Sequence, residues 1–235
     1  MIYAENVLIC IAVPLIISLV FSKKNARRFI VSFLTGMVVC LLSAYIGGFL
    51  VLVSGYGPED TSIFVSPVVE EVMKFLPVLF CFYIFETENE DIELTSVGIG
   101  AGFATFENCC FILTSGAQNL IYVLIRGSAV GVMHIVTMVL LAACLRMLRK
   151  FKLFSFSGIV GALSISMSFH GLYNLLVSEP GVSSYIGYIL PMLCALLLGL
   201  IRLKDRFMEQ SQNAQKSPDP VMHNDKDDDI FIKSE

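Results

Sequence analysis

Apolar stretches about as long as a membrane-spanning helix recur along the chain, and short polar segments separate them. A spanning helix needs about 20 mostly apolar residues. The pattern therefore predicts an all-α fold, a polytopic membrane helix bundle with about seven transmembrane helices joined by short connections. The predicted spans are residues 2–21, 29–53, 63–85, 94–114, 119–147, 154–178 and 183–203.

The end of the chain has a different pattern, because it is rich in Ser, Asn and Gln and contains the acidic run DKDDD. Such a segment has too few apolar side chains to offset the entropy lost on folding. We therefore predict two regions. Residues 1–206 form the transmembrane bundle, and residues 207–235 form a disordered, acidic cytoplasmic tail.

Basic residues follow the first, fifth and seventh predicted spans. Lysine and arginine concentrate in the cytoplasmic loops of membrane proteins. With seven spans, all three clusters fall on one side, so we expect an integral plasma-membrane protein with its N-terminus outside and its C-terminus cytoplasmic. No positive charge precedes the first apolar run, which favours a retained span over a cleaved signal peptide.

Composition agrees with a protein surrounded by the lipid bilayer. The chain is 56% hydrophobic and 15% charged, whereas soluble domains are about 45–50% apolar and about 25% charged. No basic stripe with interleaved aromatic residues occurs, so we expect no nucleic-acid partner. The seven cysteines lie in apolar runs without a CxxC pair, which is typical of small buried side chains.

The segment PVVEEVMKF, residues 67–75, places Glu70, Glu71 and Lys74 inside an otherwise apolar span. An ionisable side chain at the centre of a membrane helix costs about 2.5–3.5 kcal/mol on insertion scales. These residues must therefore face a protein interior or a water-filled cavity, and a functional site is the default interpretation. Glu70 and Lys74 lie four residues apart, so we expect them to form an ion pair that lowers the cost of burial.

Polar residues also occur in the next three predicted spans: Glu107 and Asn108, then Arg126 and His134, then His170 and Asn174. Counting from the outer ends at about 1.5 Å per residue puts Glu70, Glu107 and His170 in one layer, roughly 10–12 Å below the outer surface. The same count places His134 somewhat deeper in the membrane. We predict one shared chamber, open toward the outer side.

These residue types suit hydrolysis. Two adjacent carboxylates are a candidate general acid and base. His170 and Asn174, four residues apart, are placed to orient a substrate carbonyl or stabilise an oxyanion. Two glutamates and two histidines also form a set that zinc accepts, with a position left for water. Structural alternatives are helix–helix hydrogen bonds for the histidines and Asn108, and a snorkelling role for Arg126.

The ordered motifs EEVMK, FATFEN, a His in the next span and HGLYN resemble the PrsW family of intramembrane proteases, a branch of the superfamily that includes the type II CAAX prenyl endopeptidases. The resemblance covers residues 67–174. It implies that Glu70 and Glu71 are the catalytic pair. It implies further catalytic roles for His170, Asn174, Glu107 and His134. We expect supporting roles for Lys74, Asn108 and Arg126. Any metal would be held by Glu71, Glu107, His134 and His170.

The resemblance also implies a function, an endopeptidase that cuts a single-span membrane protein near the outer face, as in the release of a sigma factor from its anti-sigma factor. The CAAX enzymes have His where this chain has Glu107, which favours the PrsW branch over prenylated substrates. Zinc is the candidate cofactor, and a glutamate-only mechanism needs none. A non-catalytic scaffold of the same superfamily and, with less support, a transporter are the alternative functions.

Overall fold

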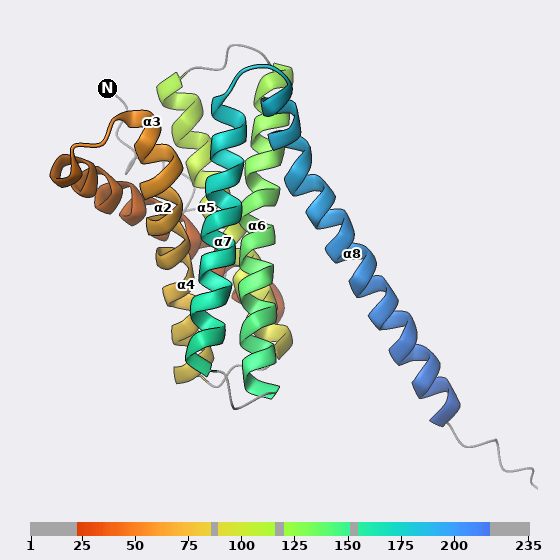
Figure 1. Cartoon of the computed structure of the whole chain (residues 1–235). Helices are drawn as coiled ribbons and strands as arrows, with labels where there is room; N and C mark the ends of the chain where they lie inside the picture. Colours follow the sequence, from red (N-terminus) through yellow and green to blue (C-terminus); the bar gives the residue numbers. More distant parts are fainter. Residues whose placement is uncertain (1–22, 86–88, 116–119, 151–154, 217–235) are drawn as a thin grey trace, which may run out of the picture. The chain divides into compact units, whose positions relative to one another are not determined.

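The computed structural model describes residues 23–85, 89–115, 120–150 and 155–216, and within them it contains helices and no strand (Figure 1). The predicted span at residues 2–21 and the end of the tail, from residue 217, lie outside the described residues. In chain order the elements are α2 (Lys24–Ser54), α3 (Pro58–Asp60), the π-helix η1 (Thr61–Val65), α4 (Ser66–Ile84), α5 (Asn89–Ser115), α6 (Leu120–Lys150), α7 (Ser155–Ser178) and α8 (Val182–Lys216).

The predicted all-α class is confirmed, whereas the described residues do not establish seven spans. Five helices, α2, α5, α6, α7 and α8, are long and apolar enough to cross a membrane. Helix α4 has the length of a span but carries three ionisable residues, Glu70, Glu71 and Lys74. Helix α8 continues to Lys216, past the predicted end at residue 203. The chain divides into two compact units after Ala195, and all the candidate site residues lie in the first.

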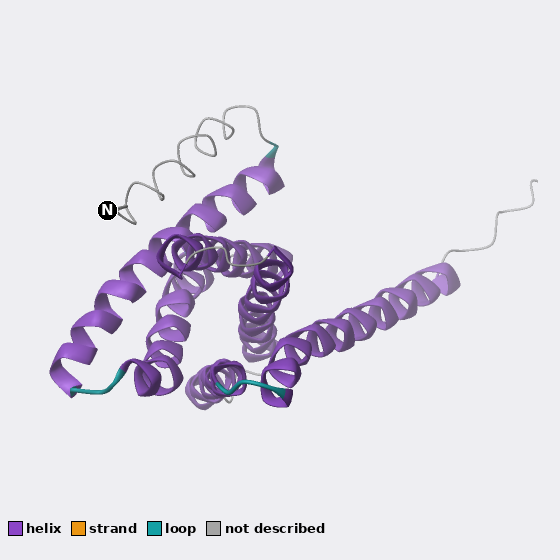
Figure 2. Ribbon diagram, turned by 90° about the horizontal axis from the view of Figure 1, so that it is seen from above, coloured by secondary structure: helices purple, strands orange, loops and turns teal. Residues whose placement is uncertain are grey.

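Within the first unit, the helices pack around α4. Helix α2 packs on α5, α5 on α6, and α6 on α7, while α4 contacts all four of them. Figure 2 shows these helices from above, grouped around a common centre. Because α4 has protein on several sides, its charged side chains can turn away from lipid, which is the condition under which such residues are tolerated at membrane depth.

Glycines bring α2 and α5 into close contact. Gly98 and Gly102 lie four residues apart on α5, and a Cβ on Gly102 would overlap the main chain of Phe33 in α2. A Cβ on Gly36 of α2 would likewise overlap the main chain of Ile99. Small residues at this spacing let membrane helices approach closely enough for main-chain van der Waals contact. The α2–α5 pair is thus a tightly packed wall behind α4.

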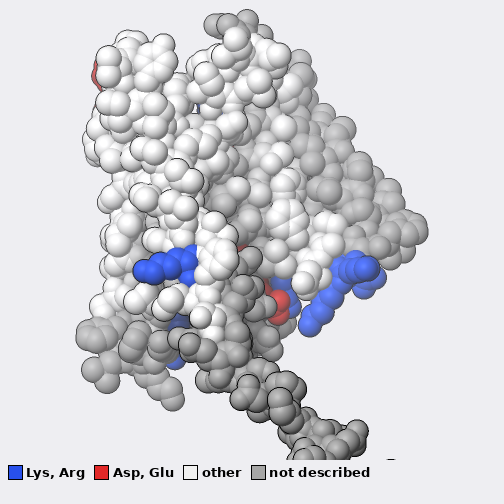
Figure 3. Space-filling model, turned by 90° about the vertical axis from the view of Figure 1, so that its right-hand side faces the viewer, with Lys and Arg blue, Asp and Glu red and all other residues white. Residues whose placement is uncertain are grey.

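Ion pairs bring two of the basic clusters to the same end of the bundle. Arg28 at the start of α2 pairs with Asp91, and Arg146 near the end of α6 lies 2.6 Å from Glu93. Both acidic residues lie near the start of α5. Figure 3 shows Lys and Arg side chains gathered toward one end of the face that it presents. This agrees with the predicted placement of these two clusters on one side, while the orientation in the membrane stays a prediction.

Candidate active site

A π-helical turn leads into the helix that carries the glutamate pair. In η1 the main-chain N–H of Ser66 donates to the carbonyl of Thr61, a spacing of five residues that is found mostly as single turns at functional sites. The side-chain amide of Asn174 in α7 donates to the carbonyl of Ser62, 2.8 Å away. A Cβ at Gly171 would stand 3.2 Å from the carbonyl oxygen of Ile63, so this glycine lets α7 approach η1 closely.

Lys74 lies at the centre of the site and is completely buried. Its Nζ lies 2.6 Å from Oε1 of Glu71, which is also completely buried. The same ammonium lies 2.8 Å from Nδ1 of His134. Since an ammonium only donates, Nδ1 is the acceptor in this contact. The predicted pairing of Lys74 with Glu70 is wrong. Glu71, three residues before Lys74, lies on the same helix face, and the contacts of His134 with Lys74 and of His170 with Glu71 favour this pair.

His170 lies between the two adjacent glutamates. Its Nδ1 is 2.8 Å from Oε1 of Glu71, and its Nε2 is 3.7 Å from Oε2 of Glu70. A carboxylate on Nδ1–H fixes the tautomer and leaves the lone pair of Nε2 available, as in carboxylate–histidine–zinc arrangements. Oε2 of Glu70 is buried and has no hydrogen-bond partner among the described residues. An unpaired buried acceptor costs about 1–3 kcal/mol, so this oxygen is suited to meet another group.

Glu107 extends the site to α5 and α6. Its Oε2 lies 2.6 Å from Nε2 of His134, and its Oε1 lies 3.9 Å from a guanidinium nitrogen of Arg126. Arg126 also donates to Oδ1 of Asn108 over 2.9 Å. The arginine therefore points into the protein, and the snorkelling alternative is wrong. The predicted helix–helix hydrogen bond of Asn108 is confirmed.

The structure joins eight of the nine predicted site residues in one network across α4, α5, α6 and α7: Glu70, His170, Glu71, Lys74, His134, Glu107, Arg126 and Asn108. Asn174 is the exception, because its amide group binds the π-helical turn. Sequence reasoning gave no role to Phe103, whose ring lies 4.8 Å from that of His134 and 5.0 Å from the Lys74 ammonium. The sequence does contain a signal for Phe103, because it lies four residues before Glu107 and therefore on the same helix face.

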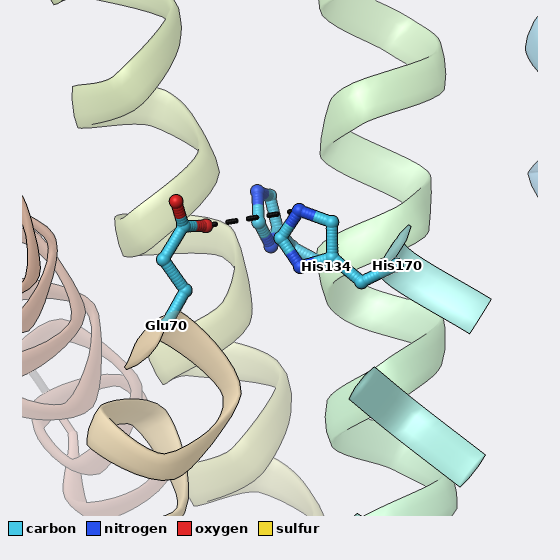
Figure 4. A group of neighbouring side chains, drawn as sticks. All are labelled: Glu70, His134 and His170. Carbon is cyan, nitrogen blue, oxygen red and sulfur yellow. Dashed lines mark ion pairs between the residues drawn. The ribbon is translucent and has the colours of Figure 1, made fainter. Parts of the chain in front are cut away.

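Three ligand-type side chains converge within this network. One potential ligand atom from each of Glu70, His134 and His170 lies within 4.8 Å of the others. Figure 4 shows the three side chains pointing toward one another from three helices. The geometry thus favours Glu70 over Glu71 and Glu107 as the carboxylate ligand. Glu71 is held by Lys74, and Glu107 is held by His134.

Comparison with known protein families identifies a related family. The family model described as PrsW family intramembrane metalloprotease matches residues 24–200, three quarters of the chain and all of the network. No curated protein and no solved structure matches in the corresponding comparisons.

Proposed function

The chain belongs to the PrsW family of intramembrane metalloproteases, and from this premise we propose that it cleaves a single-span membrane protein near the outer face of the plasma membrane. The observation that carries the proposal is the buried network on α4 to α7, in which Oε2 of Glu70 faces Nε2 of His170 with no hydrogen-bond partner of its own among the described residues. The substrate is of the anti-sigma-factor type, with its scissile bond exposed to the outer half of the bundle.

The family name implies a metal, and the residues present fit zinc. Zinc in hydrolases is bound by three nitrogen or carboxylate ligands and keeps one position for water. Glu70, His134 and His170 would hold it, since the first has an unpaired buried oxygen and the last has an available ring nitrogen. His134 would exchange one of its present partners for the metal, because Lys74 and Glu107 engage both of its nitrogens. A bound zinc polarises a carbonyl and makes water a stronger nucleophile.

The protein's own carboxylates divide the remaining work. Glu70 and Glu107 have side chains 19% and 31% exposed, whereas the side chain of Glu71 is completely buried. Glu70 and Glu107 are therefore the groups that can take a proton from an attacking water, and if Glu70 held the zinc this role would fall to Glu107. Glu71 instead orients His170, and Lys74 compensates the charge of Glu71.

Glu70→Gln tests the proposal, because it removes the charge of the residue that faces the open position and keeps its size. The full chain is co-expressed with a tagged single-span substrate, and new peptide termini are identified by mass spectrometry. We expect cleavage to be lost with normal membrane levels of the variant. The matched control is Glu59→Gln in α3, which changes an exposed residue. Undiminished cleavage by Glu70→Gln would refute the mechanism, and altered partner levels without new termini would favour a scaffold.

A further inference from the structure

The hydroxyl of Tyr173 is a buried polar group that has no place in the network of the active site. Tyr173 lies on α7 and is 2% exposed, and its hydroxyl has no hydrogen-bond partner among the described residues. A buried tyrosine hydroxyl usually has a partner, because leaving it unpaired costs free energy. The hydroxyl is therefore suited to meet a group that the protein itself does not supply.

The position of Tyr173 on α7 brings its side chain next to the candidate metal ligands. Tyr173 follows His170 by three residues, so the two side chains share one face of α7, about 4.5 Å apart along the helix axis. Side chains of a helix lean toward its N-terminus, so the ring of Tyr173 leans toward the turn that carries His170. The ring also packs with Val130 and Met133 of α6, in the turn before His134. Tyr173 therefore lies where α6 and α7 meet, one turn from both histidines.

Two charged groups of the network lie near enough to the Tyr173 hydroxyl to act on it electrostatically. They are the guanidinium of Arg126 and the carboxylate of Glu107. Glu107 is the part-exposed carboxylate that would take a proton from an attacking water. The hydroxyl is therefore close to the place where the reacting atoms of a substrate would lie.

Hydrolysis of a peptide bond needs a donor for the negative charge that develops on the carbonyl oxygen. Other donors near the site are already engaged. The side chain of Asn174 donates to the π-helical turn η1, and Lys74 and Arg126 each donate to a side chain of the network. The hydroxyl of Tyr173 has no such partner among the described residues, so it is the donor that best suits this oxygen.

We propose that the Tyr173 hydroxyl donates a hydrogen bond to the carbonyl oxygen of the scissile peptide in the transition state, an inference that rests on the proposed peptidase function. The oxygen of water bonds to the carbonyl carbon, one of its protons passes to Glu107, and the π electrons move onto the carbonyl oxygen, which accepts from Tyr173. When the carbon–nitrogen bond breaks, the C=O bond re-forms and Glu107 returns the proton to the leaving nitrogen. The buried surroundings of Tyr173 strengthen its hydrogen bond to the charged oxygen.

Tyr173→Phe tests this role, because it removes the hydroxyl and keeps the ring. The purified full-length protein and the tagged single-span substrate are mixed in detergent micelles, and initial cleavage rates are measured over a range of substrate concentrations. We expect kcat to fall about 100-fold, with KM within about twofold of the wild type. Bound zinc and the free energy of unfolding should not decrease. Tyr83→Phe, at a 54% exposed tyrosine of α4, is the matched control and should cleave like the wild type.

Three results would overturn this role of Tyr173 and leave the proposed function in place. An unchanged kcat in Tyr173→Phe would show that the reaction does not use the hydroxyl. A higher KM with an unchanged kcat would assign the hydroxyl to substrate binding. A lower kcat accompanied by less bound zinc or lower stability would assign it to the fold. Absence of cleavage by the wild type would instead overturn the proposed function, and the role of Tyr173 with it.

Discussion

Replacing Lys74 with methionine tests the energetic role of the buried cation in the site. Lys74 and Glu71 are both completely buried with 2.6 Å between the charged atoms, so Lys74→Met leaves a carboxylate without its counter-charge. Removing one partner of a buried ion pair costs about 3–5 kcal/mol. We expect a loss near the lower value, about 3 kcal/mol, because His170 still donates to Glu71.

The free energy of unfolding is measured by titrating SDS into mixed detergent–lipid micelles and following helicity by circular dichroism. The double variant Lys74→Met with Glu71→Gln should be more stable than Lys74→Met alone, since no uncompensated charge is then buried. Cleavage should be absent in both. Lys24→Met, at an exposed position of α2, is the control and should change stability by less than about 0.5 kcal/mol. A loss below about 1 kcal/mol in Lys74→Met, or a double variant less stable than the single one, would refute the reasoning.

Three further predictions concern packing, positioning and metal. Gly102→Ala should destabilise the bundle by about 1–3 kcal/mol in the same titration, because its methyl group would overlap the main chain of Phe33. Gly48→Ala is the control, since Gly48 has open space around it, and it should be neutral or slightly stabilising. Equal effects of the two substitutions would contradict the tight α2–α5 contact. Asn174→Ala should lower cleavage about tenfold and speed amide hydrogen exchange over residues 61–66, because it frees the carbonyl of Ser62; unchanged exchange would contradict this positioning role. Removing zinc with a chelator should abolish cleavage, and added zinc should restore it. Less bound zinc in His170→Ala, measured by elemental analysis, would place the ion in the site. Cleavage by a preparation free of metal would show that the reaction does not require zinc.

The membrane helices and the membership of the site could be predicted from the sequence for a clear reason. Insertion energetics select long apolar runs, and the same energetics make every ionisable residue within them conspicuous. Counting along the helices then placed Glu70, Glu107 and His170 in a common layer, and the network contains all three. These features depend on helix rise and composition, which are local properties.

The pairings within the site depend on contacts that one helix does not encode. Spacings of three and four residues both keep two side chains on one face, so spacing alone does not distinguish Glu71 from the predicted partner of Lys74, Glu70. The positions of His134 and His170 on other helices decide for Glu71. Asn174 was assigned to the substrate because its spacing from His170 fits one face. The π-helical turn that offers the carbonyl of Ser62 has no comparable signal in the sequence.

The distribution of the network along the chain has a consequence for biogenesis. Lys74 meets His134, which lies 60 residues later in the chain, and Glu71 meets His170, which lies 99 residues later. At a synthesis rate of about 5–20 residues per second, α4 leaves the ribosome roughly 5–20 s before the last of these partners. During that interval Glu71 and Lys74 can pair with each other, but they lack the contacts with His134 and His170 that complete the buried network. Helix α4 must therefore wait beside the insertion machinery, or at the bilayer surface, until α6 and α7 arrive.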